Sequence, residues 1–391
     1  MGWILNRLRR ITLTTAYLPE IDGLRFIAIA AVIFCHLASD LVYRHGLEVQ
    51  NHSNWLFNVA LHGERGVRLF FTISGFILAL PFARRYLAGN DRPDLWRYFR
   101  RRLLRLEPPY LLNVVVISIA TWVVTARLRP VLIWHFLTAA TYSHLLIFHY
   151  VNPINMIWWS LEIELQFYIL MPVLALVFKI RQVGLRRTIM MAAAFTAFIW
   201  QGAVHTWIVD MTILGHIQYF LVGLLAADLY LSNTLSKLRS TTFDLLGSLS
   251  VVFLFALPDS RSIHPTLTLF IIFGALNGRF FRNFLSLPWI SAIGSMCYTI
   301  YLWHVFVMAS ILKVTLRLLV PKSFVLSIAI QAAIIVPALF VFSVVLFLAI
   351  EKPCMQPEWP TAFQNFLRGL LRKPQTHVAF PETGQESSVN P

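Results

Sequence analysis

Long apolar runs separated by short polar segments dominate the chain. A helix needs about 20 apolar residues, at ~1.5 Å each, to cross a hydrocarbon core of ~30 Å. Runs of about this length cover 24–43, 67–83, 109–125, 158–178, 188–208, 212–231, 243–258, 264–279, 290–312 and 323–350. The pattern predicts an all-α fold, a polytopic membrane bundle of about ten transmembrane helices. The apolar stretch 131–149 is interrupted by His135, Ser143 and His144, and we expect a short or re-entrant element in an external loop.

Composition agrees with a membrane protein and argues against a soluble one. Hydrophobic residues make up 58% of the chain and charged residues 13%, whereas soluble domains carry about 25% charged residues. The net charge of +15 would suit a nucleic-acid partner, but the Lys and Arg residues lie mostly in short loops. With the N-terminus inside, alternating loops place most of them in the cytoplasm, which predicts two cytoplasmic termini and no nucleic-acid partner.

Three segments follow from this pattern. Residues 1–17 form a basic cytoplasmic N-terminus, 18–353 form one membrane domain, and 354–391 form a polar cytoplasmic tail that we expect to be partly disordered. The three cysteines are scattered and the loop histidines lack a ligand spacing, so the sequence predicts neither disulfides nor a metal site.

Ionisable residues within the apolar runs are the first candidates for chemistry, because charges in a bilayer are costly and mark functional sites. Arg25 and His36 lie eleven residues apart in the first run. At ~100° and ~1.5 Å per residue they share one stripe of a helix, about 16 Å apart. We expect Arg25 near the cytoplasmic interface and His36 towards the membrane interior or its outer half.

A second candidate is the cluster Arg101, Arg102 and Arg105, which shares one side of an interfacial helix and suits phosphate groups. Inside-positive topology or contact with anionic lipid would explain the same cluster. In the fourth run, Glu162 and Glu164 point ~200° apart, so one should line a polar cavity and the other should be interfacial or paired.

Further polar positions lie in other runs. Tyr168 shares a face with Glu164, and the i, i+3 series from Ser295 through Tyr298 and Tyr301 to His304 forms a stripe that an aromatic belt would also explain. Small residues at 74–75 predict close helix contact, and Glu351 with Lys352 fits an interfacial charge pair before a helix stop.

Taken in order, these motifs resemble the acyltransferase-3 family of integral membrane O-acyltransferases. The likeness covers most of the chain, from about residue 18 to 353. The matching positions are 22–25 with His36; 66–76; Arg101, Arg102 and Arg105 with Pro108; 159–161 with Glu164, Gln166, Phe167 and Tyr168; Phe220 with Gly223; 295–298 with 301–304; and 351–353.

The resemblance implies a reaction and roles for these residues. The donor would be acetyl-CoA or another acyl-CoA, a substrate rather than a permanently bound cofactor. Arg101, Arg102 and Arg105 would hold its phosphates, and Arg25 would guide it into a cavity. His36 would be the general base or would form an acyl-histidine.

Glu164 would orient or stabilise His36 or the acceptor, and Tyr168, Tyr301 and His304 would line the substrate cavity. The acceptor would be a sugar hydroxyl on a surface glycan or lipid-linked precursor, with small lipids or secondary metabolites as alternatives. The protein would lie among lipids of a bacterial cytoplasmic (inner) membrane.

The chain departs from the family pattern at Arg68, where an acidic residue is usual, and at Glu162, where a small one is. Many members also carry an extracytoplasmic hydrolase-like domain. None is apparent in this sequence, so we expect the membrane bundle to complete the reaction alone. Two other classes fit the pattern less well, a transporter of glycans or acyl groups and a membrane-anchored sensor or scaffold.

Overall fold

The computed structural model describes residues 7–11, 17–47, 55–89, 94–126, 129–204, 206–232, 240–257, 263–320, 323–356 and 358–361. Within these ranges every regular element is a helix, which confirms the predicted all-α fold. Most of the predicted tail, from residue 362 on, lies outside the described residues.

In the described part of the chain, ten helices of 14 residues or more overlap the predicted spans in position. They are α2 (Pro19–Ser39), α4 (Gly66–Ala88), α5 (Leu95–Val124), α8 (Trp159–Leu174), α9 (Val183–Ala203), α11 (Ile217–Leu231), α12 (Thr241–Ala256), α13 (His264–Asn277), α16 (Cys297–Thr315) and α17 (Phe324–Leu346). Shorter helices are α3 (Trp55–Leu61), α6 (Leu132–Ala140), α7 (His144–Phe148), α10 (Trp207–Asp210), α14 (Phe280–Leu285), α15 (Pro288–Ser295) and α18 (Lys352–Cys354). π-helical turns extend α2 through Asp40–Arg44 and α17 through Phe347–Glu351, and 3-10 turns precede α4 at His62–Arg65 and α8 at Met156–Trp158 and follow α8 at Ala175–Lys179.

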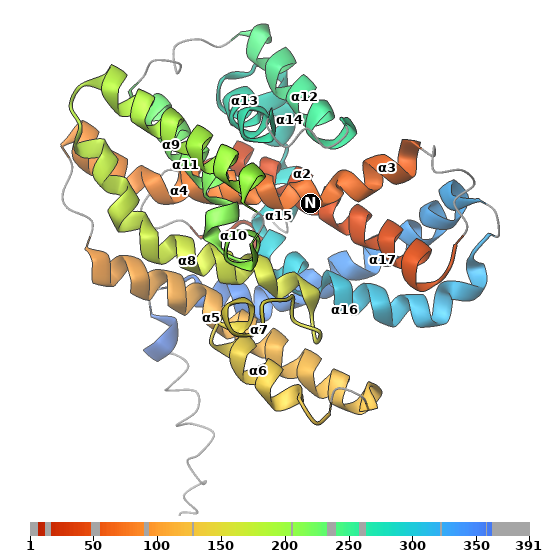
Figure 1. The fold of residues 1–391 in the computed structure, drawn as a ribbon. Coiled ribbons are helices and arrows are strands. Elements are labelled where there is room, and N and C mark those ends of the chain that lie inside the picture. Colours follow the sequence, from red (N-terminus) through yellow and green to blue (C-terminus); the bar gives the residue numbers. More distant parts are fainter. Residues whose placement is uncertain are drawn as a thin grey trace, which may run out of the picture.

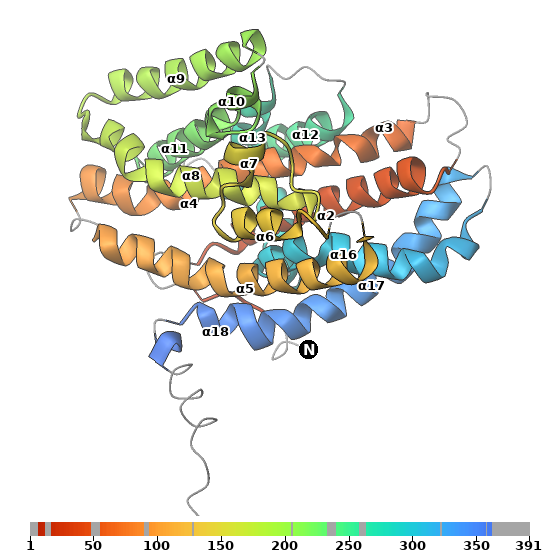
Figure 2. The same cartoon turned by 60° about the horizontal axis from the view of Figure 1, so that its bottom comes forward.

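Membrane insertion is supported by length, composition and exposed side chains. Seven helical stretches of the described chain are long and apolar enough to cross a bilayer, and α11, α12 and α13 are apolar but shorter. Large apolar side chains project outward from the peripheral helices, for example Ile119 on α5, Phe195 on α9 and Val341 on α17, each more than 60% exposed. Helices α9 and α17 lie at opposite edges in Figure 2. The chain is therefore an integral membrane protein whose outer helices face lipid.

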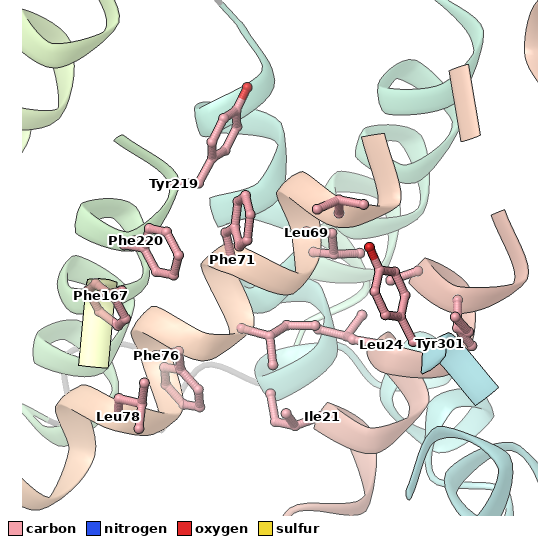
Figure 3. Close-up of a cluster of buried hydrophobic side chains, with 14 of the residues drawn as sticks. Ile21, Leu24, Leu69, Phe71, Phe76, Leu78, Phe167, Tyr219, Phe220 and Tyr301 are labelled. Carbon is pink, nitrogen blue, oxygen red and sulfur yellow. The ribbon is translucent and has the colours of Figure 1, made fainter. Parts of the chain in front are cut away.

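Helix α2 occupies the middle of the molecule and packs against α4, α15 and α16 (Figure 1). On the other side of α4, helix α11 approaches so closely that a Cβ atom at Gly75 or Gly223 would collide with backbone of the opposite helix. Phe71 of α4 stacks on Phe220 of α11, with ring centroids 4.8 Å apart (Figure 3). The close contact expected from the small residues at 74–75 is confirmed.

Two local features differ from the expected spans. The run 290–312 is broken at Met296 into α15 and α16, so Ser295 lies on a different helix from Tyr298. The arginine cluster does not lie on a separate interfacial helix, because α5 starts at Leu95 and continues through Pro108 and Pro109 into the span. Its first turn is capped by the Asp94 carboxylate, which accepts a hydrogen bond from the Arg97 backbone amide at 3.1 Å.

The stretch 131–149 forms α6 and α7, two short helices joined by a turn in which Tyr142 has positive φ. They lie beside α5, where the Tyr110 hydroxyl donates a hydrogen bond to the Ala139 carbonyl at 2.9 Å. The expectation of short elements there is confirmed.

Candidate active site

A cavity of about 100 Å³ opens between α2, α4, α5, α8, α15 and α16. Its wall carries three arginines, Arg25 from α2 and Arg102 and Arg105 from α5. Glu164 and Tyr168 of α8 line the same space. Residues separated by up to about 140 positions in the chain thus form one polar chamber inside an apolar bundle, in which ionisable groups are costly unless they are paired or functional.

Arg25 is held by a buried carboxylate at the start of α2. Asp22 is fully buried, and its Oδ1 lies 2.6 Å from Arg25 Nη1 and 3.1 Å from Arg10 Nε. Its second oxygen accepts a hydrogen bond from the Ser295 hydroxyl at 3.0 Å. Burial, reinforced by the neighbouring Arg25 charge, lowers the pKa of Arg10 to about 9. Asp22 therefore ties the N-terminal segment, α2 and α15 together around the arginine that lines the cavity.

Arg105 has a similar anchor at the end of α17. Its Nη2 lies 3.9 Å from Oε1 of Glu351, which is fully buried. The other Glu351 oxygen accepts hydrogen bonds from the backbone amide and hydroxyl of Thr299, at 3.1 and 2.5 Å. Glu351 is thus a link between α5, α16 and α17.

Glu164 points into the cavity and is bound by neutral donors. Its Oε1 accepts hydrogen bonds from the Ser74 hydroxyl at 2.8 Å and the Tyr168 hydroxyl at 2.6 Å. The Arg102 guanidinium lies over the Tyr98 ring, 6.0 Å from its centroid. The position of Glu164 confirms that one of the two glutamates, Glu162 and Glu164, lines a polar cavity.

Glu162 takes the other predicted role. It is 1% exposed, and its Oε2 accepts a hydrogen bond from the Leu145 backbone amide of α7 at 2.9 Å. In the same region His135 Nδ1 lies 2.9 Å from His144 Nε2. Burial, with His135 alongside, lowers the pKa of His144 to about 4, and burial also lowers the pKa of His135. These groups hold α6 and α7 against α8, away from the cavity.

Tyr301 connects the cavity to a buried pair of histidines. Its side chain lines the cavity, and its hydroxyl lies 2.7 Å from the Ser160 hydroxyl. Its carbonyl oxygen lies 2.7 Å from His304 Nδ1, one turn further along α16. His304 Nε2 in turn lies 2.7 Å from His36 Nδ1 on α2.

The structure brings several of the predicted site residues together and leaves others apart. Arg25, Arg102, Arg105, Glu164, Tyr168 and Tyr301 line the cavity. Arg101, His36 and His304 are not among its lining residues. Arg25 and His36 both lie on the continuous helix α2, as expected. Glu164 bonds to Ser74 and Tyr168, and the partner that the structure gives His36 is His304.

Arg68, one of the departures from the family pattern, lies in the first turn of α4. Its Nη1 is 2.5 Å from His264 Nδ1, and its Nη2 is 3.5 Å from the exposed Glu64 carboxylate. A carboxylate role at position 68 is therefore replaced here by a cation bound between α4 and α13.

Sequence reasoning missed the anchoring carboxylates. Asp22 was noted only as part of a motif, and Glu351 was expected in a charge pair with its neighbour Lys352 and not with Arg105. Both lie at the boundary of an apolar run, and the cost of burying a carboxylate could have indicated that each needs a cationic partner. The i, i+3 spacing could have paired Asp22 with Arg25, but nothing local in the sequence indicates that Glu351 pairs with Arg105.

Comparison with known proteins decides the family. Residues 18–352 match the model of acyltransferase family 3, described as an acyltransferase domain. The chain belongs to this family. The match confirms the family suggested by the motifs and places the protein among acyl-transferring enzymes.

Curated relatives of this acyltransferase-3 protein include the O-acetyltransferase OatA of Staphylococcus aureus strain NCTC 8325. It is 26% identical over 333 aligned positions, which cover 74% of this chain and 50% of OatA. A putative O-acetyltransferase of Staphylococcus aureus strain COL is 26% identical over 329 positions, with the same coverage. The chain thus spans about half the length of these relatives. No solved structure matches it.

Proposed function

We propose that this protein transfers an acetyl or other short acyl group from acyl-CoA to a hydroxyl of a surface glycan or lipid-linked precursor. The observation that carries the proposal is the cavity in which Arg25, Arg102 and Arg105 meet Glu164, with Tyr301 leading on to His36. The names of the OatA relatives support O-acetylation as the reaction type.

The arginines suit the charged part of the donor. Arg102 and Arg105 lie three residues apart on α5, and Arg25 faces the same space from α2. Guanidinium groups bind phosphate oxygens through charge-assisted and often bidentate hydrogen bonds. In this proposal the phosphates bind at the arginines and the thin pantetheine arm enters the cavity.

His36 is the general base of the proposed reaction. Eleven residues beyond Arg25, it stands about 16 Å further along the same helix. Its imidazole takes the proton of the acceptor hydroxyl as the oxygen bonds to the acyl carbon. The carbon–sulfur bond then breaks, and the proton passes from His36 to the departing thiolate, which gives the ester and CoA.

The topology that fits this reaction has ten spans, two cytoplasmic termini and a position in a bacterial inner membrane. The ion pair Arg186–Asp228, at 2.5 Å, joins the start of α9 to the end of α11, as expected if both lie on the cytoplasmic side. The pair Arg105–Glu351 joins the first half of α5 to the end of α17, as expected if both of these segments also lie on the cytoplasmic side. Acyl-CoA would then reach the arginines from the cytoplasm.

Binding and turnover of radiolabelled acetyl-CoA by the purified protein in detergent test the proposal. Arg102→Gln should weaken binding on the order of tenfold, because one charged hydrogen bond is worth about 1.5–3 kcal/mol. Arg100→Gln removes the same charge from an exposed position two residues earlier and is the matched control. His36→Ala should retain binding and lose turnover.

Three results would overturn the proposal. A folded wild type that binds no acyl-CoA would rule out this donor. Flux of a glycan through proteoliposomes without any acylated product would assign the chain to transport instead. Equal loss of binding in Arg102→Gln and Arg100→Gln would show that the cavity is not the donor site.

A further inference from the structure

The contact between α2 and α16 is made through two imidazole rings. His36 and His304 are nearly parallel, with ring planes 15° apart and centroids separated by 5.0 Å. His304 is fully buried, and His36 is partly exposed. Their nitrogens Nδ1 of His36 and Nε2 of His304 lie 2.7 Å apart, a hydrogen-bond distance.

The Tyr301 carbonyl, which contacts Nδ1 of His304, determines which nitrogen carries the proton in both imidazole rings. A carbonyl oxygen can only accept, so His304 Nδ1 must donate to the Tyr301 carbonyl. A neutral His304 then has a bare Nε2, which accepts from His36 Nδ1. A neutral His36 with its proton on Nδ1 keeps a lone pair on Nε2. One backbone carbonyl thus determines which nitrogen of His36 is basic.

We propose that His304 is the positioning residue for His36: it holds the ring and its tautomer so that Nε2 receives the proton of the acceptor hydroxyl. The inference rests on the proposed function, in which His36 is the base. It replaces the expectation that His304 contacts substrate, because His304 is fully buried and does not line the cavity.

The same bond stabilises the charge that forms during the reaction. When His36 Nε2 takes the hydroxyl proton, Nδ1–H becomes the donor of a charge-assisted hydrogen bond to His304, which is shorter and stronger than the neutral one. His304 holds no net charge before this step. It therefore does what an orienting carboxylate does for a base in other enzymes, without burying an anion.

The titratable groups on α2 and α16 near the histidine pair have partners of their own in the described part of the chain. On α2 and its extension, Arg44 is paired with Asp40 at 3.1 Å. On α16, the Tyr301 hydroxyl is engaged by Ser160. No carboxylate there forms an ion pair with either imidazole, so the hydrogen bond between the rings is the contact that orients His36.

A second histidine pair in the molecule provides an internal control. His135 Nδ1 lies 2.9 Å from His144 Nε2, and His144 Nδ1 lies 3.1 Å from the Tyr150 carbonyl. The hydrogen-bond pattern is the same, but the pair joins α6 to α7 outside the cavity. Disturbing it should affect folding without affecting the chemical step.

Steady-state kinetics of three variants test the positioning role. His304→Phe keeps an aromatic ring but offers no acceptor, and kcat should fall on the order of 100-fold with KM for acetyl-CoA within about twofold. His304→Gln places an amide oxygen near the former Nε2, and kcat should stay within about tenfold of the wild type. His144→Phe should keep the wild-type kcat while its thermal stability falls.

The pattern across these variants decides between the possible roles. Equal loss in His304→Phe and His304→Gln would overturn the hydrogen-bond role, as would a rise in KM at unchanged kcat, which would mean substrate contact. A fall of kcat in His144→Phe comparable to that in His304→Phe would mean that the effect is general unfolding.

Nitrogen NMR of the protein labelled with ¹⁵N-histidine tests the tautomer without any turnover. His36 should carry its proton on Nδ1 in the wild type and should become a mixture of tautomers in His304→Phe. A proton on Nε2 of wild-type His36 would overturn the inference. If the protein consumed no acyl-CoA, the proposed function would fail on its own, and the spectrum would still decide whether His304 sets the tautomer.

Discussion

Replacing Asp22 by Asn should destabilise the fold far more than the loss of one hydrogen bond. The carboxylate is fully buried and neutralises two arginines, Arg10 and Arg25, at 3.1 and 2.6 Å. The Asn amide has nearly the same shape, so packing is preserved. What disappears is the only negative charge that the structure places in ion-pair contact with either guanidinium among the described residues.

The magnitude follows from the burial of all three groups. The Arg10 and Arg25 side chains are 6% and 14% exposed. Removing one partner of a buried ion pair costs about 3–5 kcal/mol, because the remaining charge stays desolvated. At about 2 °C per kcal/mol, the lower end for soluble domains, the melting temperature should fall by about 6–10 °C. Ser295→Ala removes only the neutral donor to Asp22 and should cost about 0.5–1.5 kcal/mol.

Thermal unfolding in detergent, followed by tryptophan fluorescence, measures these differences. The double variant Asp22→Asn with Arg10→Gln removes one charge of each sign, and it should be more stable than the sum of the two single effects predicts. Strict additivity, or a melting temperature of Asp22→Asn equal to the wild type, would refute the reasoning that charge balance holds this end of α2.

Three further outcomes are expected. The free energy of unfolding should fall by up to about 3 kcal/mol as the pH drops from about 6.5 to 4, because the folded state lowers the pKa of His144 to about 4 and so resists its protonation. The His144→Asn variant should lack this fall. Thermal melting at a series of pH values measures the difference. Gly223→Val should abolish the folded yield in size-exclusion chromatography, because its Cβ collides with the backbone of α4, whereas Gly202→Val, with open space around it, should express normally. Glu351→Gln should raise KM for acetyl-CoA about threefold or more by releasing Arg105, and an unchanged KM in a folded variant would contradict that link.

The sequence was sufficient to predict the helical architecture and six residues that line the cavity. Apolar runs located the helices because a bilayer demands about 20 apolar residues per span. Periodicity placed Arg25 and His36 on one helix, and the ~200° between Glu162 and Glu164 predicted that only one of them lines the cavity. Such inferences succeed because they concern residues within a single helix.

Contacts between helices were beyond the sequence. His36 and His304 are 268 positions apart, and no local pattern shows that their rings meet. The break at Met296 moved Ser295 off the predicted stripe and onto α15, where it binds Asp22. Which polar residues become partners depends on how α2, α15 and α16 pack, and one sequence does not determine that packing by periodicity alone.

The two ends of the proposed reaction path reduce the free-energy cost of burying polar groups in different ways. Near the start of α2, cations are required for a phosphorylated donor, and two of the three cavity arginines are matched by a buried carboxylate, Arg25 by Asp22 and Arg105 by Glu351. About 16 Å deeper, the proposed base is a neutral imidazole oriented by another neutral imidazole. Charge appears there only while the proton is in transit. A carboxylate beside His36 would orient it equally well, but it would have to remain desolvated through every turnover. The His36–His304 pair avoids the permanent desolvation cost of such a carboxylate. We therefore expect His304→Asp to fold less well than His304→Gln and to be no more active, although an aspartate is the usual partner of catalytic histidines in other enzymes.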